Sequence, residues 1–354
     1  MIASAPTQAP RRVLIVKPSA LGDVATATPV LRGLRRTYPH AHLAWLVSRT
    51  CAPLIAHDRD LDEVIPFDRQ GMAAPWLSPR AARLAAALLR RLRRARFDWV
   101  VDLQGLLRSG IFTAATGASL RAGFADAREG AVMFYNCRVR ASARHTVDRN
   151  IELARRLGID ARRGDFTLQV DPEAGQFAHA FLQDHNLRPG AFVACVPPAR
   201  WATKQYPPRH WRRVIAALAH WRSVVLLGAP GDQHLCEATA ENLDGIINMA
   251  GRTSVEQFVA LIAASGGVVC CDSSAAVIAP ALGVDVVVMI GPTRVERTGP
   301  YVRGRAIVAD VPCRGCLKRR CSHVTCMQMI DPADVIAAAR EMFVEGTDGC
   351  HTVS

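Results

Sequence analysis

The sequence predicts two doubly wound α/β domains in tandem. Short runs rich in Val, Ile and Leu alternate with helical patterns through both halves of the chain. This alternation is typical of parallel sheets whose strands are joined by crossover helices. The chain has 354 residues, of which 50% are hydrophobic, so it is long enough for two domains with a core each.

The first half contains several strand candidates, each a short and mostly apolar run bounded by polar or turn residues. They are Val13–Val16, His42–Val47, Glu63–Pro66 and Trp99–Asp102. Helical patterns separate these runs. The pattern that begins at about Val24 repeats apolar residues at helical spacing, so we expect one of its faces to be core. That face comprises Val24, Ala27, Val30, Leu31 and Leu34.

The second half repeats the alternation. Its strand candidates are Phe192–Val196, Ser223–Leu227, Gly245–Asn248, Val268–Cys271 and Val284–Ile290. Helices are expected near His210–Ala219, Gln233–Asn242, Val255–Ala264 and Ala275–Leu282, with a last helix over Asp331–Phe343. The second half therefore predicts a sheet of the same kind as the first.

The domain boundary is expected near Val170–Gly175, after a helical stretch at Val147–Leu157. This gives an N-terminal domain of residues 13–172 and a C-terminal domain of residues 173–343. Residues 1–12 and 344–354 are expected to be flexible tails, and 313–326 a cysteine-rich loop of the second domain. For two doubly wound domains in tandem, we expect ligands in a cleft between the carboxyl ends of their strands.

The composition favours an anionic partner. Lys plus Arg number 44 and Asp plus Glu 31, which gives a formal net charge of +13. Nucleic acid, an acidic membrane face or an acidic or phosphorylated substrate would suit this charge, and so would a merely arginine-rich proteome. The N-terminus lacks a signal-peptide pattern, and we expect a cytosolic protein. Its eleven cysteines are then thiols or metal ligands instead of disulfides.

The turn Gly22-Asp23 joins the first strand to the first helical pattern. It is not a dinucleotide-binding glycine motif, and a fixed carboxylate there would repel a phosphate. Asp23 therefore either caps the helix or holds a negative charge in the cleft for chemistry.

Three segments of the second half point to an anion site. Lys204 lies in a proline-bounded loop after the first strand, where a cation over the cleft favours an anion contact and a solvated lysine is the alternative. Asp272-Ser273-Ser274 ends one strand and begins a helix of small residues, which suits a diphosphate or merely caps the helix. Gly291-Pro292-Thr293 ends the neighbouring strand.

The segment Pro79–Phe97 predicts a basic amphipathic helix. Its leucines lie on one face and its arginines on another. That face is either solvated or contacts an anionic membrane surface or acceptor. The arginines are Arg80, Arg83, Arg90, Arg91 and Arg94.

Two further clusters carry possible metal ligands. Cys313, Cys316, Cys321 and Cys326 have the spacing C-x2-C-x4-C-x4-C, which predicts a Zn or Fe site, an unmetallated loop or redox chemistry. The acidic residues of "HDRDLDEVIPFD", Asp58, Asp60 and Asp62, lie in a polar connection and are expected to be solvated.

Taken together, these motifs resemble glycosyltransferase family 9, the ADP-heptose:lipopolysaccharide heptosyltransferases. The resemblance begins at "VLIVKPSALGDVATATPVLRGLRRTYP" and continues through "VVDLQGLLRSG", "GFADAREGAVMFYN" and "HTVDRNIELARRLG". In the second half it includes "ATKQYPPRHW", "MAGRTS", "GPTRVERTGPY" and the cysteine cluster. It covers Val13 to about Phe343 in consistent order.

The resemblance implies a GT-B fold and transfer of heptose from ADP-heptose to the lipopolysaccharide inner core, with inversion and without an essential cofactor. It implies that Asp23 is the catalytic carboxylate of the Gly-Asp-Val turn and that Lys204 contacts the donor phosphate. Other implied donor residues are Thr203, Asp232, Asp272, Ser273, Ser274 and Thr293. Candidate acceptor contacts are Arg108, Arg121 and Arg128. A metal at the four cysteines would be structural.

The sequence departs from the family pattern D-[ST]-G-x-x-H at two positions, where Ser274 replaces Gly and Val277 replaces His. A degenerate member that binds nucleotide-sugar without turnover is therefore one alternative. Protein O-heptosylation is another, because the cysteine cluster also resembles that of autotransporter heptosyltransferases. Expected partners are ADP-heptose, the lipopolysaccharide core acceptor and the inner face of the cytoplasmic membrane in peripheral contact. We expect no nucleic acid, because the arginines do not interleave with a recognisable binding module.

Overall fold

The computed structural model describes residues 8–73 and 78–343. Most of the expected tails, residues 1–7 and 344–354, lie outside the described residues. The prediction that residues 8–12 belong to a flexible tail needs correction at its end. Arg12 begins the first strand, and the backbone N–H groups of Arg11 and Arg12 donate to Oδ2 of Asp98 at 2.7 and 2.8 Å.

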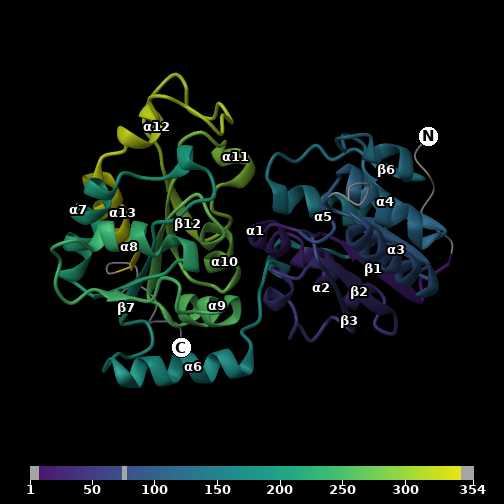
Figure 1. Ribbon diagram of the computed structural model, residues 1–354, viewed down its shortest axis with the longest axis horizontal. Coiled ribbons are helices and arrows are strands. Elements are labelled where there is room, and N and C mark those ends of the chain that lie inside the picture. Colours follow the sequence, from purple (N-terminus) through teal and green to yellow (C-terminus); the bar gives the residue numbers. More distant parts are fainter. Residues whose placement is uncertain (1–7, 74–77, 344–354) are drawn as a thin grey trace, which may run out of the picture. The chain divides into compact units, whose positions relative to one another are not determined.

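The chain divides into two compact units between Gln169 and Val170, a few residues before the predicted boundary. Each unit is a parallel sheet with helices on both faces (Figure 1). In the first unit the described strands run in the order β3-β2-β1-β4-β5-β6, and neighbours pair in parallel. They are β1 (Arg12–Val16), β2 (His42–Ser48), β3 (Glu63–Phe67), β4 (Trp99–Asp102), β5 (Leu120–Phe124) and β6 (Cys137–Val139).

Helices cover both faces of the first sheet, and its strands are therefore buried on both faces. Alternate residues such as Leu14 and Val16 pack with Leu88, Leu92 and Phe112 from α3 and α4. The helices are α1 (Leu21–Ala25), α2 (Thr28–Thr37), α3 (Pro79–Arg94), α4 (Leu107–Thr116) and α5 (Thr146–Arg156), with short 3₁₀ turns η1 (Ala52–Leu54), η2 (Ala131–Phe134) and η3 (Arg163–Asp165).

The helical pattern after Val24 forms two helices, α1 and α2, instead of one. Pro29 stands in the first turn of α2, where its missing N–H leaves no helical bond unmade and favours a new helix start. The predicted core face is confirmed, since its members are fully buried. They are Val24, Ala27, Val30, Leu31 and Leu34.

In the second unit the described strands run in the order β12-β11-β10-β7-β8-β9, again in parallel. They are β7 (Phe192–Val196), β8 (Ser223–Leu226), β9 (Ile247–Asn248), β10 (Gly267–Cys271), β11 (Val286–Met289) and β12 (Gly304–Ile307). On one face the strands pack against α7 and α13, with Trp211 and Phe343 fully buried.

The second unit contains longer helices that cover the sheet and shorter ones that follow its strands. The longer ones are α6 (Pro172–Asp184), α7 (Pro208–Ala219), α8 (Gln233–Ala240), α9 (Val255–Ala264) and α13 (Pro332–Phe343). The shorter ones are α10 (Ala275–Ala281), α11 (Val295–Thr298), α12 (Thr325–Gln328), η4 (Ala202–Lys204) and η5 (Pro230–Asp232).

The basic helix is confirmed as α3, and all the arginines predicted for its polar face are exposed. Arg91 among them pairs with Glu63 at 2.8 Å. None of the helices in the described part of the chain is long and apolar enough to cross a membrane.

The strand order of each sheet creates one position at which the chain changes direction. In the first sheet this switch lies between β1 and β4, and in the second between β7 and β10. The carboxyl ends of two such strands diverge in their connections, which leaves a crevice where doubly wound domains bind ligands. Asp23 follows β1, Arg108 follows β4, Lys204 follows β7 and Asp272 follows β10. The predicted site residues therefore cluster at the two switch positions.

Candidate active site

The first half-site is built around Asp23 at the carboxyl end of β1. Its side chain is exposed, and Oδ2 accepts the N–H of Ala20 at 3.0 Å. Asp23 thus caps α1, as one of the two interpretations expected. Because one carboxylate accepts several hydrogen bonds, the cap does not exhaust the capacity of Asp23 to accept a proton.

Two arginines lie beside the Asp23 turn. Arg69, after β3, donates to Oγ of Ser19 at 3.1 Å, and Arg108, after β4, donates to the carbonyl of Arg69 at 3.5 Å. Burial and the nearby charge of Arg69 lower the pKa of Arg108. Two like charges are held close together next to the Asp23 turn, and an anion between them would relieve their repulsion.

A buried carboxylate shapes the loop that precedes α4 and Arg108. Asp102 is fully buried at the end of β4 and accepts the N–H groups of Gln104 and Gly105 and the hydroxyl of Tyr135. The phenol lies 2.6 Å from Oδ2 of Asp102. Burial raises the pKa of Asp102, although these donors act in the opposite direction. Asp102 is therefore a positioning group of the half-site.

The structure treats the other two predicted acceptor residues differently. Arg121 donates to the carbonyls of Ala118 and Phe134 at 2.8 and 3.1 Å, so its guanidinium holds the edge of β5 together. The guanidinium is thus already engaged by its own domain, and the contact of Arg121 with the acceptor stays a prediction. Arg128 is exposed, and its backbone N–H donates to the carbonyl of Gly105 at 2.9 Å, which places it beside the loop before α4.

The second half-site is centred on Lys204, Asp272 and Thr293. The ammonium of Lys204 lies 2.8 Å from Oδ2 of Asp272. The hydroxyl of Thr293 donates to the same oxygen. Loops that follow β7, β10 and β11 thus meet at one carboxylate, and the anion site expected there stays a prediction.

Next to this cluster lies a polar atom that lacks a partner. Oγ of Ser273 is buried and makes no hydrogen bond within the described residues. Buried hydroxyls are normally satisfied, so an orphan at a switch position points to a bound group. Ser274 begins α10 without a side-chain cap bond, and Asp232 caps η5 by accepting the N–H of Ala229 at 2.9 Å.

Thr203 turns away from this cluster. Its hydroxyl donates to the carbonyl of Lys318 at 2.9 Å, in the cysteine-rich loop. Thr203 thus joins two loops, and its contact with the donor stays a prediction. Trp201 connects the same loops, since Lys204 lies 4.6 Å and Arg319 4.8 Å from its ring centre.

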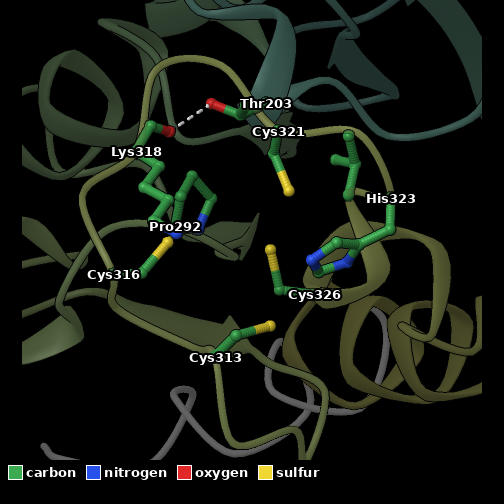
Figure 2. A pocket seen from close by; sticks show the side chains of 9 residues that line it. Thr203, Pro292, Cys313, Cys316, Lys318, Cys321, His323 and Cys326 are labelled. Carbon is green, nitrogen blue, oxygen red and sulfur yellow. Dashed lines mark hydrogen bonds between the residues drawn. The ribbon is translucent and has the colours of Figure 1, made fainter.

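The four predicted cysteine ligands line one cavity of about 50 Å³, together with His323 and Thr203 (Figure 2). All four are free thiols. In residues 8–73 and 78–343, no three His, Cys, Asp or Glu side chains are arranged so that they could hold a metal ion as they stand. The four thiols therefore lie around one cavity, but they do not form a metal-binding ligand set as they stand.

The acidic run before β3 was expected to be solvated, and for Asp58 this is wrong. Its side chain is only 3% exposed and lies against Arg32 of α2, with Nη2 to Oδ2 at 2.7 Å. The pair joins α2 to the loop before β3, so Asp58 serves the fold.

Sequence reasoning missed Arg69, Trp201 and Lys17. The buried ammonium of Lys17 donates to the carbonyl of Leu103 at 2.7 Å and so joins the loops after β1 and β4. Lys17 stands in the quoted "VLIVKPS" run, where its place at the end of a buried strand was an available signal. Arg69 has no motif around it.

Comparison with known proteins identifies the family of this chain. The model of glycosyltransferase family 9 (heptosyltransferase) matches residues 85–326, which include α4, Lys204, Asp272 and the cysteine loop. That is more than half of the chain. The chain belongs to glycosyltransferase family 9. It is thus a glycosyltransferase, and its two Rossmann-like sheets are those of the GT-B fold.

Individual relatives agree with this assignment. Lipopolysaccharide heptosyltransferase 1 of Pseudomonas aeruginosa is 28% identical over 322 residues, which is 88% of each chain. The Escherichia coli heptosyltransferase WaaC with ADP-2-deoxy-2-fluoro heptose is 25% identical, with a TM-score of 0.73 over 95% of this chain and 99% of that one. A family 9 glycosyltransferase from Veillonella parvula has the same fold, with a TM-score of 0.78 at 19% identity over 95% and 97% of the two chains.

Proposed function

We propose that this chain transfers heptose from ADP-heptose to the inner core of lipopolysaccharide, with inversion at the anomeric carbon. The observation that carries the proposal is the division of charge between the two switch positions. One presents an exposed carboxylate beside paired arginines, and the other presents a lysine and an unsatisfied serine hydroxyl. The relatives' names, lipopolysaccharide heptosyltransferase 1 and WaaC with an ADP-heptose analogue, support this choice of substrates.

In the proposed step, an acceptor hydroxyl attacks the anomeric carbon while the bond from that carbon to the diphosphate oxygen breaks. The hydroxyl proton passes to the carboxylate of Asp23, and ADP leaves with the electron pair of the broken bond. General-base assistance of this kind is worth about 10²–10⁴-fold. Because these side chains suffice, the proposal gives no metal or organic cofactor a part in the transfer.

The leaving diphosphate gains charge as the bond breaks, and the second half-site suits that charge. The ammonium of Lys204 and the hydroxyl of Ser273 are donors that favour it. Asp272 already neutralises part of the lysine charge, so Lys204 stabilises the diphosphate by sharing its donors between the carboxylate and the phosphates.

The acceptor side is proposed to recognise an anionic group. Arg69 and Arg108 lie together at the Asp23 turn, and Arg128 belongs to the neighbouring loop. Planar guanidinium groups bind carboxylate and phosphate oxygens well, and such groups would place an acceptor hydroxyl near Asp23.

We also propose that the N-terminal domain contacts an anionic membrane surface. The arginines of α3 are exposed, and Leu107, Ile111 and Met133 are exposed apolar residues of α4 and η2. Arginines and apolar side chains together favour peripheral binding to anionic lipid. The variant Arg83→Gln/Arg90→Gln/Arg94→Gln should sediment less with phosphatidylglycerol vesicles, mainly at low salt. The control Arg188→Gln/Arg209→Gln/Arg213→Gln should sediment as wild type does, and equal losses in both variants would remove α3 from the interaction.

Transfer is tested by ADP release and by the mass of the product. The purified chain is incubated with lipopolysaccharide from a heptose-deficient strain and with ADP-heptose, ADP-glucose or UDP-glucose. We expect ADP release only with ADP-heptose and only with acceptor, and a gain of one heptose in the core. Release with another nucleotide-sugar would overturn the donor assignment, for which Ser274 and Val277 are the first positions to examine. Nucleotide binding without release would support the degenerate member, and transfer to a protein alone would support O-heptosylation.

A further inference from the structure

The cavity of the cysteine-rich loop lies outside the proposed transfer chemistry. Cys313, Cys316 and Cys321 belong to the loop before α12, and Cys326 lies in α12. Figure 2 shows their sulfur atoms directed into one space, with the side chain of His323 at its rim. Four cysteines around one point form the ligand set of tetrahedral zinc and iron sites.

We propose that Cys313, Cys316, Cys321 and Cys326 bind one Zn²⁺ or Fe²⁺ ion as thiolates, and that this ion fastens the loop to the segments that carry Lys204 and Thr293. The metal is structural, and it takes no part in bond making or breaking.

The charge of the loop fits a metal–tetrathiolate centre. Four thiolates around a divalent ion carry a net negative charge that must be balanced in a partly buried position. The loop supplies only cations for this purpose, since no acidic residue lies between Cys313 and Cys326. The basic residues in this interval are Arg314, Lys318, Arg319 and Arg320.

The hydrogen bonds of His323 favour four cysteines over three cysteines and a histidine. Nδ1 of His323 accepts the backbone N–H of Thr325 at 3.3 Å and lies 2.7 Å from its hydroxyl. A neutral imidazole that accepts at Nδ1 carries its proton on Nε2, and a protonated nitrogen does not coordinate metal. His323 therefore borders the site without supplying a ligand.

The loop is already tied to both donor segments. The N–H groups of Gly315 and Leu317 donate to the carbonyls of Gly291 and Pro292 at 3.0 and 2.7 Å. The carbonyl of Lys318 accepts the hydroxyl of Thr203. Pro292 and Thr203 directly precede Thr293 and Lys204 in the sequence, so a metal that fixes the loop also fixes these two side chains.

The metal would tighten an arrangement that is only approximate without it. No three of the thiols form a ready ligand set in the described structure. Thiolate–zinc bonds are about 2.3 Å long, so binding must draw the sulfur atoms together. Cys316 is exposed and Cys313 and Cys321 are partly exposed, whereas Cys326 is buried, so the loop side can move toward Cys326.

Metal content is the first test. The full chain is purified without a histidine tag or chelator, and zinc and iron are measured by plasma mass spectrometry. We expect about one ion per chain. The variants Cys316→Ser and Cys321→Ser should lose it, whereas His323→Ala and the control Cys137→Ser, a half-buried thiol of β6, should keep it. A metal-free wild type that also fails to take up added Zn²⁺ or Fe²⁺ would overturn the proposal, as would full metal content in Cys316→Ser/Cys321→Ser.

A second test needs no variant that might misfold. The wild-type chain is stripped with a chelator and titrated with Co²⁺, which reports thiolate coordination through intense charge-transfer absorption and tetrahedral geometry through its visible bands. We expect saturation at about one equivalent and a rise in Tm of roughly 5 °C or more. Absence of thiolate bands, together with a loop disulfide found by mass spectrometry, would replace the metal site by a redox pair.

The consequence for the donor half-site rests on the proposed function and has its own readout. ADP affinity is compared by calorimetry between stripped and metal-loaded chain, and we expect it to be about tenfold weaker without metal. If the loaded chain holds its metal but binds no ADP, the donor assignment fails and the metal site stands. If the chain binds ADP equally well with and without metal, the fastening role is overturned although the ion is bound.

Discussion

Nζ of Lys204 lies 2.8 Å from Oδ2 of Asp272, and the hydroxyl of Thr293 donates to that same oxygen. The three residues come from loops after β7, β10 and β11, and they assemble at the position where the second sheet changes direction. Lys204 is thus held in place by a carboxylate before any ligand arrives. This arrangement ties donor affinity and local stability to the same residue.

Replacing Lys204 by Ala should weaken ADP binding roughly tenfold or more, because a charge-assisted contact to phosphate is lost. It should also lower the free energy of unfolding, since Asp272 is left nearly buried without its cation. Calorimetric titration with ADP and urea denaturation measure the two effects, with Arg209→Ala, at an exposed position of α7, as control.

The double variant Lys204→Ala/Asp272→Asn separates these effects. It removes the unpaired charge, so stability should recover while ADP affinity stays low. Recovery of affinity in the double variant would mean that Lys204 acts only by neutralising Asp272.

Arg108→Ala should raise KM for the lipopolysaccharide acceptor about tenfold while leaving ADP affinity unchanged. The reason is that Arg108 lies with Arg69 beside the Asp23 turn in the N-terminal domain, whereas Lys204 belongs to the C-terminal domain. Arg121→Ala is the matched comparison, because its guanidinium is bound to backbone carbonyls. It should lower Tm and leave KM nearly unchanged, and the reverse pattern would exchange the roles assigned to the two arginines.

Gly291→Ala should lower the free energy of unfolding by about 1–3 kcal/mol. A Cβ at Gly291 would lie 2.6 Å from Sδ of Met327 and 2.9 Å from Sγ of Cys326, both well inside van der Waals contact. At Gly231 a Cβ meets nothing within 4 Å, so Gly231→Ala is a control with the same chemical change. Equal urea midpoints for the two variants would show that α12 does not pack on Gly291 as described.

Asp102 predicts a particular dependence of stability on pH. Burial raises its pKa, so the folded chain holds this proton above the pH at which the unfolded chain loses it. The stabilisation from the protonated form is complete below the ordinary aspartate pKa and is lost as pH rises through the raised pKa of the folded chain. It amounts to about 1.4 kcal/mol for each unit by which the folded pKa exceeds the unfolded one. Asn does not titrate, so the unfolding free energy of wild type minus that of Asp102→Asn should fall from pH 4 to pH 8 in urea denaturation. A flat difference would show that Asp102 titrates normally.

The central strands could be predicted from sequence because burial on both faces leaves an uninterrupted apolar run, as in Val13–Val16 and Val268–Cys271. The strands that sequence reasoning missed, β5, β6 and β12, are short or lie near a sheet edge. Half-exposed residues such as Arg121 and Arg305 interrupt their apolar pattern, and pairing with a neighbour defines them. Strands with this interrupted pattern therefore carry little local signal.

The candidate site likewise contains residues that the sequence could predict and contacts that it could not. Asp23, Lys204 and Asp272 could be predicted because each follows a recognisable strand. The pairing of Asp58 with Arg32, the turn of Thr203 toward Lys318 and the closeness of Arg69 to Arg108 all join residues distant in sequence. Such contacts depend on how loops pack, which composition and periodicity do not specify.

The most direct test of the central claim is the turnover of Asp23→Asn with ADP-heptose and a heptose-deficient lipopolysaccharide acceptor, followed by ADP release. Asn keeps the oxygen that accepts the N–H of Ala20 and removes the basicity. As general base, Asp23 predicts a kcat reduced roughly 10²-fold or more, with ADP affinity and Tm close to wild type. A variant that turns over within a few-fold of wild type would contradict the account, because Asp23 would then be only the cap of α1.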